Sequence, residues 1–121
     1  MRKVFLNISN HPSTKWSEEQ LKAAKKYGEI VDIQFPNVPT DEDAVTIHNL
    51  ANMSAKNILR LYKDDLVTIH IMGEMTFTYA FVCIMKAHGI PCFASTTERV
   101  ATEKDGVKTS VFQFVQFRQY I

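Results

Sequence analysis

Residues 9–13, Ser-Asn-His-Pro-Ser, follow an apolar run at residues 3–8 and gather several hydrogen-bonding groups in one short segment. Ser9, Asn10, His11 and Ser13 can all contact a polar ligand, and a histidine such as His11 can also act as an acid or base. A tight turn needs fewer polar groups than these. An Asx or Ser turn leading into the next helix accounts equally well for the loop taken alone.

Two later segments carry similar chemistry. Gly73 and Glu74 follow the apolar run at 66–72, and a carboxylate there can orient a ligand, accept a ribose hydroxyl or act as a base. The alternative is that Glu74 and Thr76 only cap a helix. The third segment is STTER, which carries the hydroxyls of Ser95, Thr96 and Thr97. Its Arg99 can neutralise a phosphate. The alternative is that this segment is only an exposed strand edge.

The elements that position these residues alternate along the chain. Ser17 with Gln20 forms a capping-box pattern, Gly28 is a natural helix stop, and EKDG has the composition of a hairpin turn. We expect strands at 3–8, 29–35, 66–72, 89–95 and 109–120, and helices at 17–27, from 40–43 towards 63, and at 76–88.

This alternation predicts one α/β domain over residues 1–121, with a mainly parallel sheet in the order 2-1-3-4, helices on both faces and a C-terminal antiparallel hairpin. A ligand crevice is then expected beyond the carboxyl ends of the strands, where the order reverses between the first and third. The three polar segments fall on that edge. Arg118 is a weaker candidate than Arg99, because an antiparallel last strand ends at the opposite edge.

Composition narrows the function further. A net charge of +1 does not fit a general nucleic-acid binder, so DNA is not an expected partner. Cys83 and Cys92 lack metal or disulfide spacing, which favours a cytoplasmic setting, and no apolar run is long enough for a membrane. No metal pattern, Walker loop or dinucleotide fingerprint is present, so no cofactor is expected, and His70 is interpreted as a packed core histidine.

Five stretches of the chain, NISNHPS, WSEEQ, GEMTFT, STTER and FQFVQFR, resemble a group of small CRISPR-associated proteins. Such proteins are similar to the Rossmann-like sensor domains and ring nucleases of type III systems, which bind cyclic oligoadenylate messengers. The resemblance implies a Rossmann-like domain that forms a homodimer, with two crevices around a two-fold axis. It also implies ligand-facing groups at Ser9, Asn10, His11, Gly73, Glu74, Thr76 and Arg99.

The resulting hypothesis is a metal-independent ring nuclease, in which a ribose 2′-hydroxyl of the cyclic oligoadenylate attacks the adjacent phosphate. Arg99 and loop amides would stabilise the phosphate, Ser9 and Thr76 would position it, and His11 would be an acid or base. A sensor or sponge that binds the ring without cutting it needs the same cradle. A structural protein that assembles through its apolar last strand is the third hypothesis.

Overall fold

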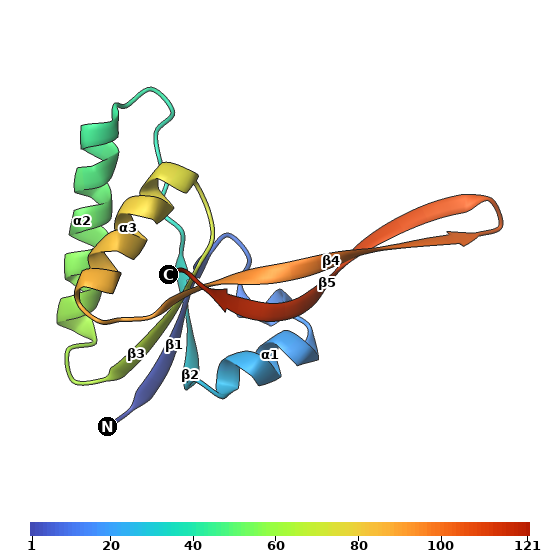
Figure 1. Ribbon diagram of the computed structural model, residues 1–121, viewed down its shortest axis with the longest axis horizontal. Helices are drawn as coiled ribbons and strands as arrows, with labels where there is room; N and C mark the ends of the chain where they lie inside the picture. Colours follow the sequence, from blue (N-terminus) through green and yellow to red (C-terminus); the bar gives the residue numbers. More distant parts are fainter.

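A five-stranded sheet in the order β2-β1-β3-β4-β5 forms the centre of the computed structural model, which describes residues 1–121 (Figure 1). β1 pairs in parallel with β2 and β3, β3 pairs in parallel with β4, and β4 and β5 are antiparallel. The predicted fold class and strand order are confirmed. The elements are β1 (Lys3–Ser9), η1 (Ser13–Lys15), α1 (Glu18–Lys25), β2 (Glu29–Gln34), α2 (Ala44–Leu61), β3 (Leu66–Ile71), α3 (Met75–Ala87), β4 (Cys92–Lys104) and β5 (Val107–Gln119).

The two faces of the sheet are covered differently. Helices α2 and α3 lie together on one face, and the shorter α1 lies on the other (Figure 1). Alternate β1 residues such as Val4, Leu6 and Ile8 join the main apolar core with Ile69 and Ile71 of β3. The intervening residues of both strands, which include polar side chains, therefore point to the α1 face.

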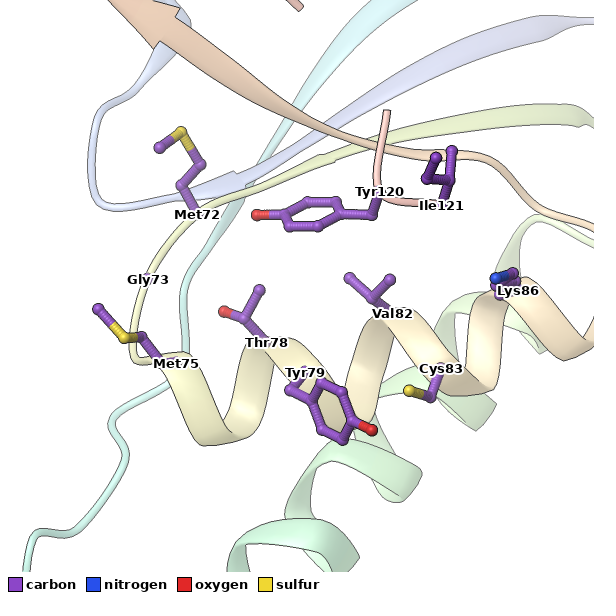
Figure 2. Close-up of a pocket in the computed structure, with 10 residues that line it drawn as sticks. All are labelled: Met72, Gly73, Met75, Thr78, Tyr79, Val82, Cys83, Lys86, Tyr120 and Ile121. Atoms are coloured by element: carbon purple, nitrogen blue, oxygen red, sulfur yellow. The ribbon is translucent and has the colours of Figure 1, made fainter. Parts of the chain in front are cut away.

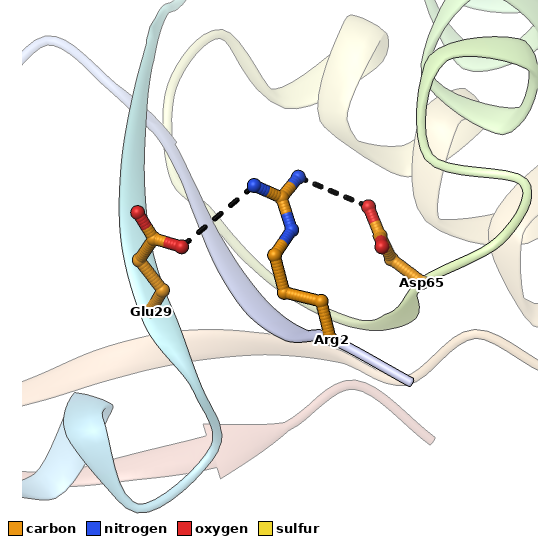
Figure 3. Close-up of polar contacts among 3 residues, drawn as sticks. All are labelled: Arg2, Glu29 and Asp65. Carbon is orange, nitrogen blue, oxygen red and sulfur yellow. Dashed lines mark hydrogen bonds and ion pairs between the residues drawn. The ribbon is translucent and has the colours of Figure 1, made fainter.

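The amino-terminal edge of the sheet is tied together by Arg2. Its guanidinium contacts Asp65 at 3.0 Å, just before β3, and Glu29 at 3.7 Å, at the start of β2 (Figure 3). Because Arg2 precedes β1, one side chain links the beginnings of three adjacent strands. Its carboxylate partners keep it at the opposite end of the sheet from the predicted crevice.

The main departure from the predicted elements concerns β4. The sequence predicts a strand at 89–95 followed by a loop, whereas β4 continues through the STTER segment to Lys104 and pairs with β5 along its length. The predicted turn does form, with Asp105 and Gly106 both at positive φ, as a two-residue hairpin turn requires. The ribbon that results extends well away from the rest of the protein (Figure 1).

The helices begin close to the expected positions. Ser17 caps α1 by accepting a hydrogen bond from the Gln20 amide at 3.2 Å, and Asp43 caps α2 in the same way through Thr46 at 2.9 Å. No helix combines the length and apolar character needed to cross a membrane.

Candidate functional site

Two adjoining cavities lie at the carboxyl ends of β1 and β2, whereas the sequence predicts a crevice between the first and third strands. One, of about 400 Å³, is lined by Asn7, Ser9, Asn10, Pro12, Asp32, Ile33 and Gln34. The other, of about 320 Å³, is lined by Asn10, Gln34, Phe35, Pro36, Asn37, Val38 and Glu74. Asn10 and Gln34 line both cavities, so together they form one polar crevice that extends from the end of β2 to the start of α3.

The Ser9–Ser13 loop is a turn stabilised by its own polar groups. The Ser9 hydroxyl accepts from the His11 amide at 3.2 Å, and the Asn7 side chain donates to the His11 carbonyl at 3.0 Å. The turn interpretation therefore accounts for Ser9 and for the backbone of His11. Asn10 and the His11 side chain are exposed.

Asp32, on β2, fixes the far end of this loop. Its carboxylate accepts hydrogen bonds from the Ser13 amide at 3.0 Å and the Ser13 hydroxyl at 2.8 Å, and from Asn7 at 2.9 Å. Partial burial acts to raise the pKa of Asp32, but the hydrogen bonds from Asn7 and Ser13 outweigh it and lower the pKa overall. Asp32 is thus a firmly ionised carboxylate in the crevice wall.

A row of polar side chains crosses the sheet on its α1 face. Asp32, Asn7 and His70 occupy matching positions in the parallel strands β2, β1 and β3. The Asn7 side chain donates to Asp32, and its carbonyl oxygen lies 2.8 Å from His70 Nδ1. The Ser95 hydroxyl on β4 lies 2.6 Å from His70 Nε2, which completes the row.

The hydrogen bonds of Asn7 determine the tautomer of His70. The Asn7 amide nitrogen faces two acceptors, the Asp32 carboxylate and the His11 carbonyl, so its oxygen must face His70. His70 Nδ1 is therefore the protonated nitrogen, and Nε2 accepts from Ser95. The Gln20 side chain in turn donates to the Ser95 hydroxyl at 3.1 Å.

Aromatic rings enclose His70 and keep it neutral. Trp16 and Phe117 present their rings at 5.3 and 5.4 Å, and Phe5 stacks at 6.3 Å. Burial lowers the pKa of His70 to about 4. The row orients the Ser95 hydroxyl through this hydrogen bond, but His70 itself, at 3% exposure, is a core histidine, in agreement with the sequence interpretation.

Glu74 caps α3. Its carboxylate accepts from the Thr76 amide at 2.7 Å, the Phe77 amide at 3.0 Å and the Thr76 hydroxyl. The Thr76 hydroxyl, followed by the two amides, lowers the pKa of Glu74. The Glu74 carboxylate therefore occupies the N-terminus of α3, as the capping alternative expects.

The structure separates the STTER residues from the crevice. Arg99 lies opposite Phe112 on the extended hairpin, and its guanidinium donates to the Ser110 hydroxyl at 3.1 and 2.9 Å. Thr96 bonds to the Gln116 backbone, and Thr97 is exposed on β4. Arg118, opposite Ala94, is nearer the body of the sheet than Arg99, because β4 continues beyond the edge that was expected to end it.

Gly73 has a packing role that the sequence did not reveal. A Cβ at this position would lie 2.3 Å from the ring of Phe35.

Of the eleven residues predicted for the site, the structure places Ser9, Asn10 and Glu74 on the crevice, with Ser13 bound to its wall and Ser95 in the polar row.

Sequence reasoning gave no site role to five residues of the crevice and the polar row: Asn7, Asp32, His70, Gln20 and Gln34. A signal was available, because Asn7 and His70 each interrupt an apolar strand at the fifth residue of that strand. Polar residues at the same level of adjacent parallel strands come side by side.

A separate cavity of about 580 Å³ lies between α3 and the end of the chain (Figure 2). Its lining is mainly apolar and includes Met72, Val82 and Tyr120, together with Thr78, whose buried hydroxyl has no hydrogen-bond partner. Gly73 is the only predicted site residue on its wall. This cavity suits an apolar group and is distinct from the polar crevice.

No group of three or more His, Cys, Asp or Glu side chains is arranged to hold a metal ion.

The family of the chain follows from comparison with known proteins. A family model described as the uncharacterized protein MJ1673 family matches residues 3–118, and the chain belongs to that family. No curated protein matches it significantly.

Among solved structures, the chain is similar to Enterococcus italicus Csm6 bound to cyclic hexa-2′-fluoro-hexa-dAMP, with 11% identity and a TM-score of 0.47. The match covers 80% of this chain and 34% of that one, so the chain spans about a third of the length of its structural neighbour.

Proposed function

We propose that this protein binds an adenine nucleotide of the cyclic oligoadenylate class in the polar crevice, and that it acts as a sensor or sponge. The observation that carries the proposal is the pair of adjoining cavities lined by Asn10 and Gln34 at the carboxyl ends of β1 and β2. This is the edge at which open α/β sheets bind ligands. The resemblance of five sequence stretches to small CRISPR-associated proteins supports the choice of nucleotide.

The side chains of the crevice favour adenine and ribose. Asn10, Gln34 and Asn37 each offer an amide donor beside a carbonyl acceptor, the pattern that pairs with N6 and N7 of adenine. Asp32 and Glu74 can accept hydrogen bonds from ribose hydroxyls, the role that an acidic residue has in many dinucleotide sites.

The phosphates would face the solvent rather than the crevice. No lysine or arginine lines either cavity, and both of its carboxylates have a lowered pKa and are ionised near neutral pH. A phosphate placed between them would be repelled. We therefore assign base and ribose recognition to the crevice of each protomer.

Binding is better supported than cleavage. The three residues predicted to be catalytic do not converge: the His11 side chain is exposed, Glu74 caps α3 and Arg99 lies on the hairpin. Ring opening by the ribose 2′-hydroxyl would need a group that neutralises the phosphate, and none lines the crevice. The function proposed is accordingly messenger binding without turnover.

The test is incubation of the purified protein, in metal-free buffer, with cyclic oligoadenylates of several ring sizes, following thermal shift and chromatography of the nucleotide. A stabilising shift without linear product is expected, and it should be lost in the double variant N10A/Q34A. A shift with linear product would replace the sensor by a ring nuclease. No shift with any ring would overturn the proposal.

A further inference from the structure

The outer part of the β4–β5 hairpin, from Thr97 to Phe114 and here called the arm, leaves the body of the protein as a two-stranded ribbon (Figure 1). Every residue from 101 to 113 is exposed. β3 pairs with β4 only at Cys92 and Phe93, so from Ala94 onward one edge of β4 has no neighbouring strand. An isolated two-stranded ribbon is marginally stable in water, and a third strand would stabilise it.

The backbone groups of that open edge can be assigned. The Ser95 amide points towards the β3 side, where it donates to Met72 Sδ at 3.2 Å. Because amides alternate along a strand, those of Arg99, Ala101 and Glu103 point to the same open side. They form a row of unpaired donors and acceptors, which is the template for adding a strand.

We propose that the open edge of β4 pairs antiparallel with the same edge of a second copy of the chain, with the two-fold axis at Ala101. The segment reads Glu98-Arg99-Val100-Ala101-Thr102-Glu103-Lys104. Antiparallel pairing about Ala101 places Glu98 opposite Lys104 of the second copy and Arg99 opposite Glu103. Each opposite-charge pair then occurs twice, on shared faces of a four-stranded sheet.

The backbone restricts the neighbouring registers. A shift by one residue places the open-side groups of Ala101 opposite Val100, whose amide points to β5, so the hydrogen bonds of that pair are lost. A shift by two residues keeps the hydrogen bonds, but in one direction it removes every opposite-charge pair, and in the other it leaves only Arg99 opposite Asp105. The register centred on Ala101 therefore has the most opposite-charge pairs. The outer edge of β5 lacks this complementarity, since its charged residues, Lys108 and Arg118, are both basic.

The first test is a charge swap at positions whose own β5 partners are uncharged: Glu98 faces Gln113 and Lys104 faces Val107. Sedimentation velocity at low salt should show a wild-type dimer. E98K and K104E should each weaken it about tenfold or more, and E98K/K104E should restore it. K26E, an equal charge change on exposed Lys26, is the control and should leave the dimer intact.

The second test is crosslinking in a C83S background, which removes the exposed native thiol. Residues that face each other in a hydrogen-bonded antiparallel pair have Cα atoms about 5.5 Å apart, within disulfide range. A101C should therefore form a disulfide-linked dimer on mild oxidation, whereas S110C, directly opposite Ala101 on β5, should not.

A wild-type monomer at all concentrations, failure of the double swap to restore the dimer, or equal crosslinking of S110C would each overturn the interface. The interface depends only on the arm and would stand if the crevice bound no nucleotide. Thermal shift with cyclic oligoadenylates, measured on E98K, keeps the two proposals separate, because the crevice lies outside the arm.

Discussion

The Ser95 hydroxyl donates a hydrogen bond across 2.6 Å to Nε2 of His70, and this contact joins β4 to a chain of polar groups that ends at Asp32 on β2. Four parallel strands are therefore linked by side chains on the α1 face as well as by their backbones. The link requires a neutral His70, since Nε2 must keep its lone pair. The wall of the crevice and the protonation state of one buried histidine are thus coupled.

The first prediction concerns stability at low pH. The pKa of folded His70 is about 4, below its ordinary value of 6.5, so between these values only the unfolded chain binds the proton. The free energy of unfolding should therefore fall by about 3 kcal/mol, through this residue alone, as the pH drops from 6.5 to 4. Above pH 6.5 His70 is neutral in both states and causes no loss of stability. Urea unfolding from pH 6.5 to 4 measures this fall.

The control for this effect is H70Q, which removes the titrating group. Its unfolding free energy should depend less steeply on pH between 4 and 6.5 than that of the wild type, whatever its stability at pH 7. Equal slopes in the two proteins would show that His70 titrates normally.

The second prediction is that N7A destabilises the fold by about 3 kcal/mol, because it leaves Nδ1 of the buried His70 without a partner and removes the hydrogen bonds from Asn7 to Asp32 and to the His11 carbonyl. N57A removes an asparagine from the exposed face of α2, where it only accepts from Arg60, and should cost less than about 0.5 kcal/mol. Chemical denaturation compares the two variants. Similar losses in both would mean that the polar row adds little to stability.

The fold could be predicted more fully than the site. Alternation of apolar strands with capped helices is local, so it predicted the strand order and the hairpin. Register is not local: that Asn7, His70 and Asp32 stand side by side depends on how three strands align. The length of β4 was also hidden, because the polar segment Ser95–Arg99 is a strand only by virtue of its pairing with β5.

The third prediction separates packing from ligand binding at Gly73. In G73A the new methyl group would overlap the Phe35 ring, whose displacement from the core should cost about 2 kcal/mol. G89A is the comparison, because the space around Gly89 is open; its φ of +71° leaves only a backbone cost of about 1 kcal/mol. Thermal unfolding without nucleotide measures both. A fully stable G73A that had lost nucleotide binding would instead return Gly73 to the ligand site.

The last prediction distinguishes the crevice from the site expected on the sequence alone. Gln34 lines both cavities, so Q34A should weaken cyclic oligoadenylate binding about tenfold by removing one bidentate contact to adenine. Arg99 is held by Ser110 on the hairpin, so R99A should leave the affinity within about twofold. Isothermal titration of both variants with the ring that gives the largest thermal shift makes the comparison. If R99A abolished binding and Q34A did not, the nucleotide would lie along the arm, and the polar crevice would have only a structural role.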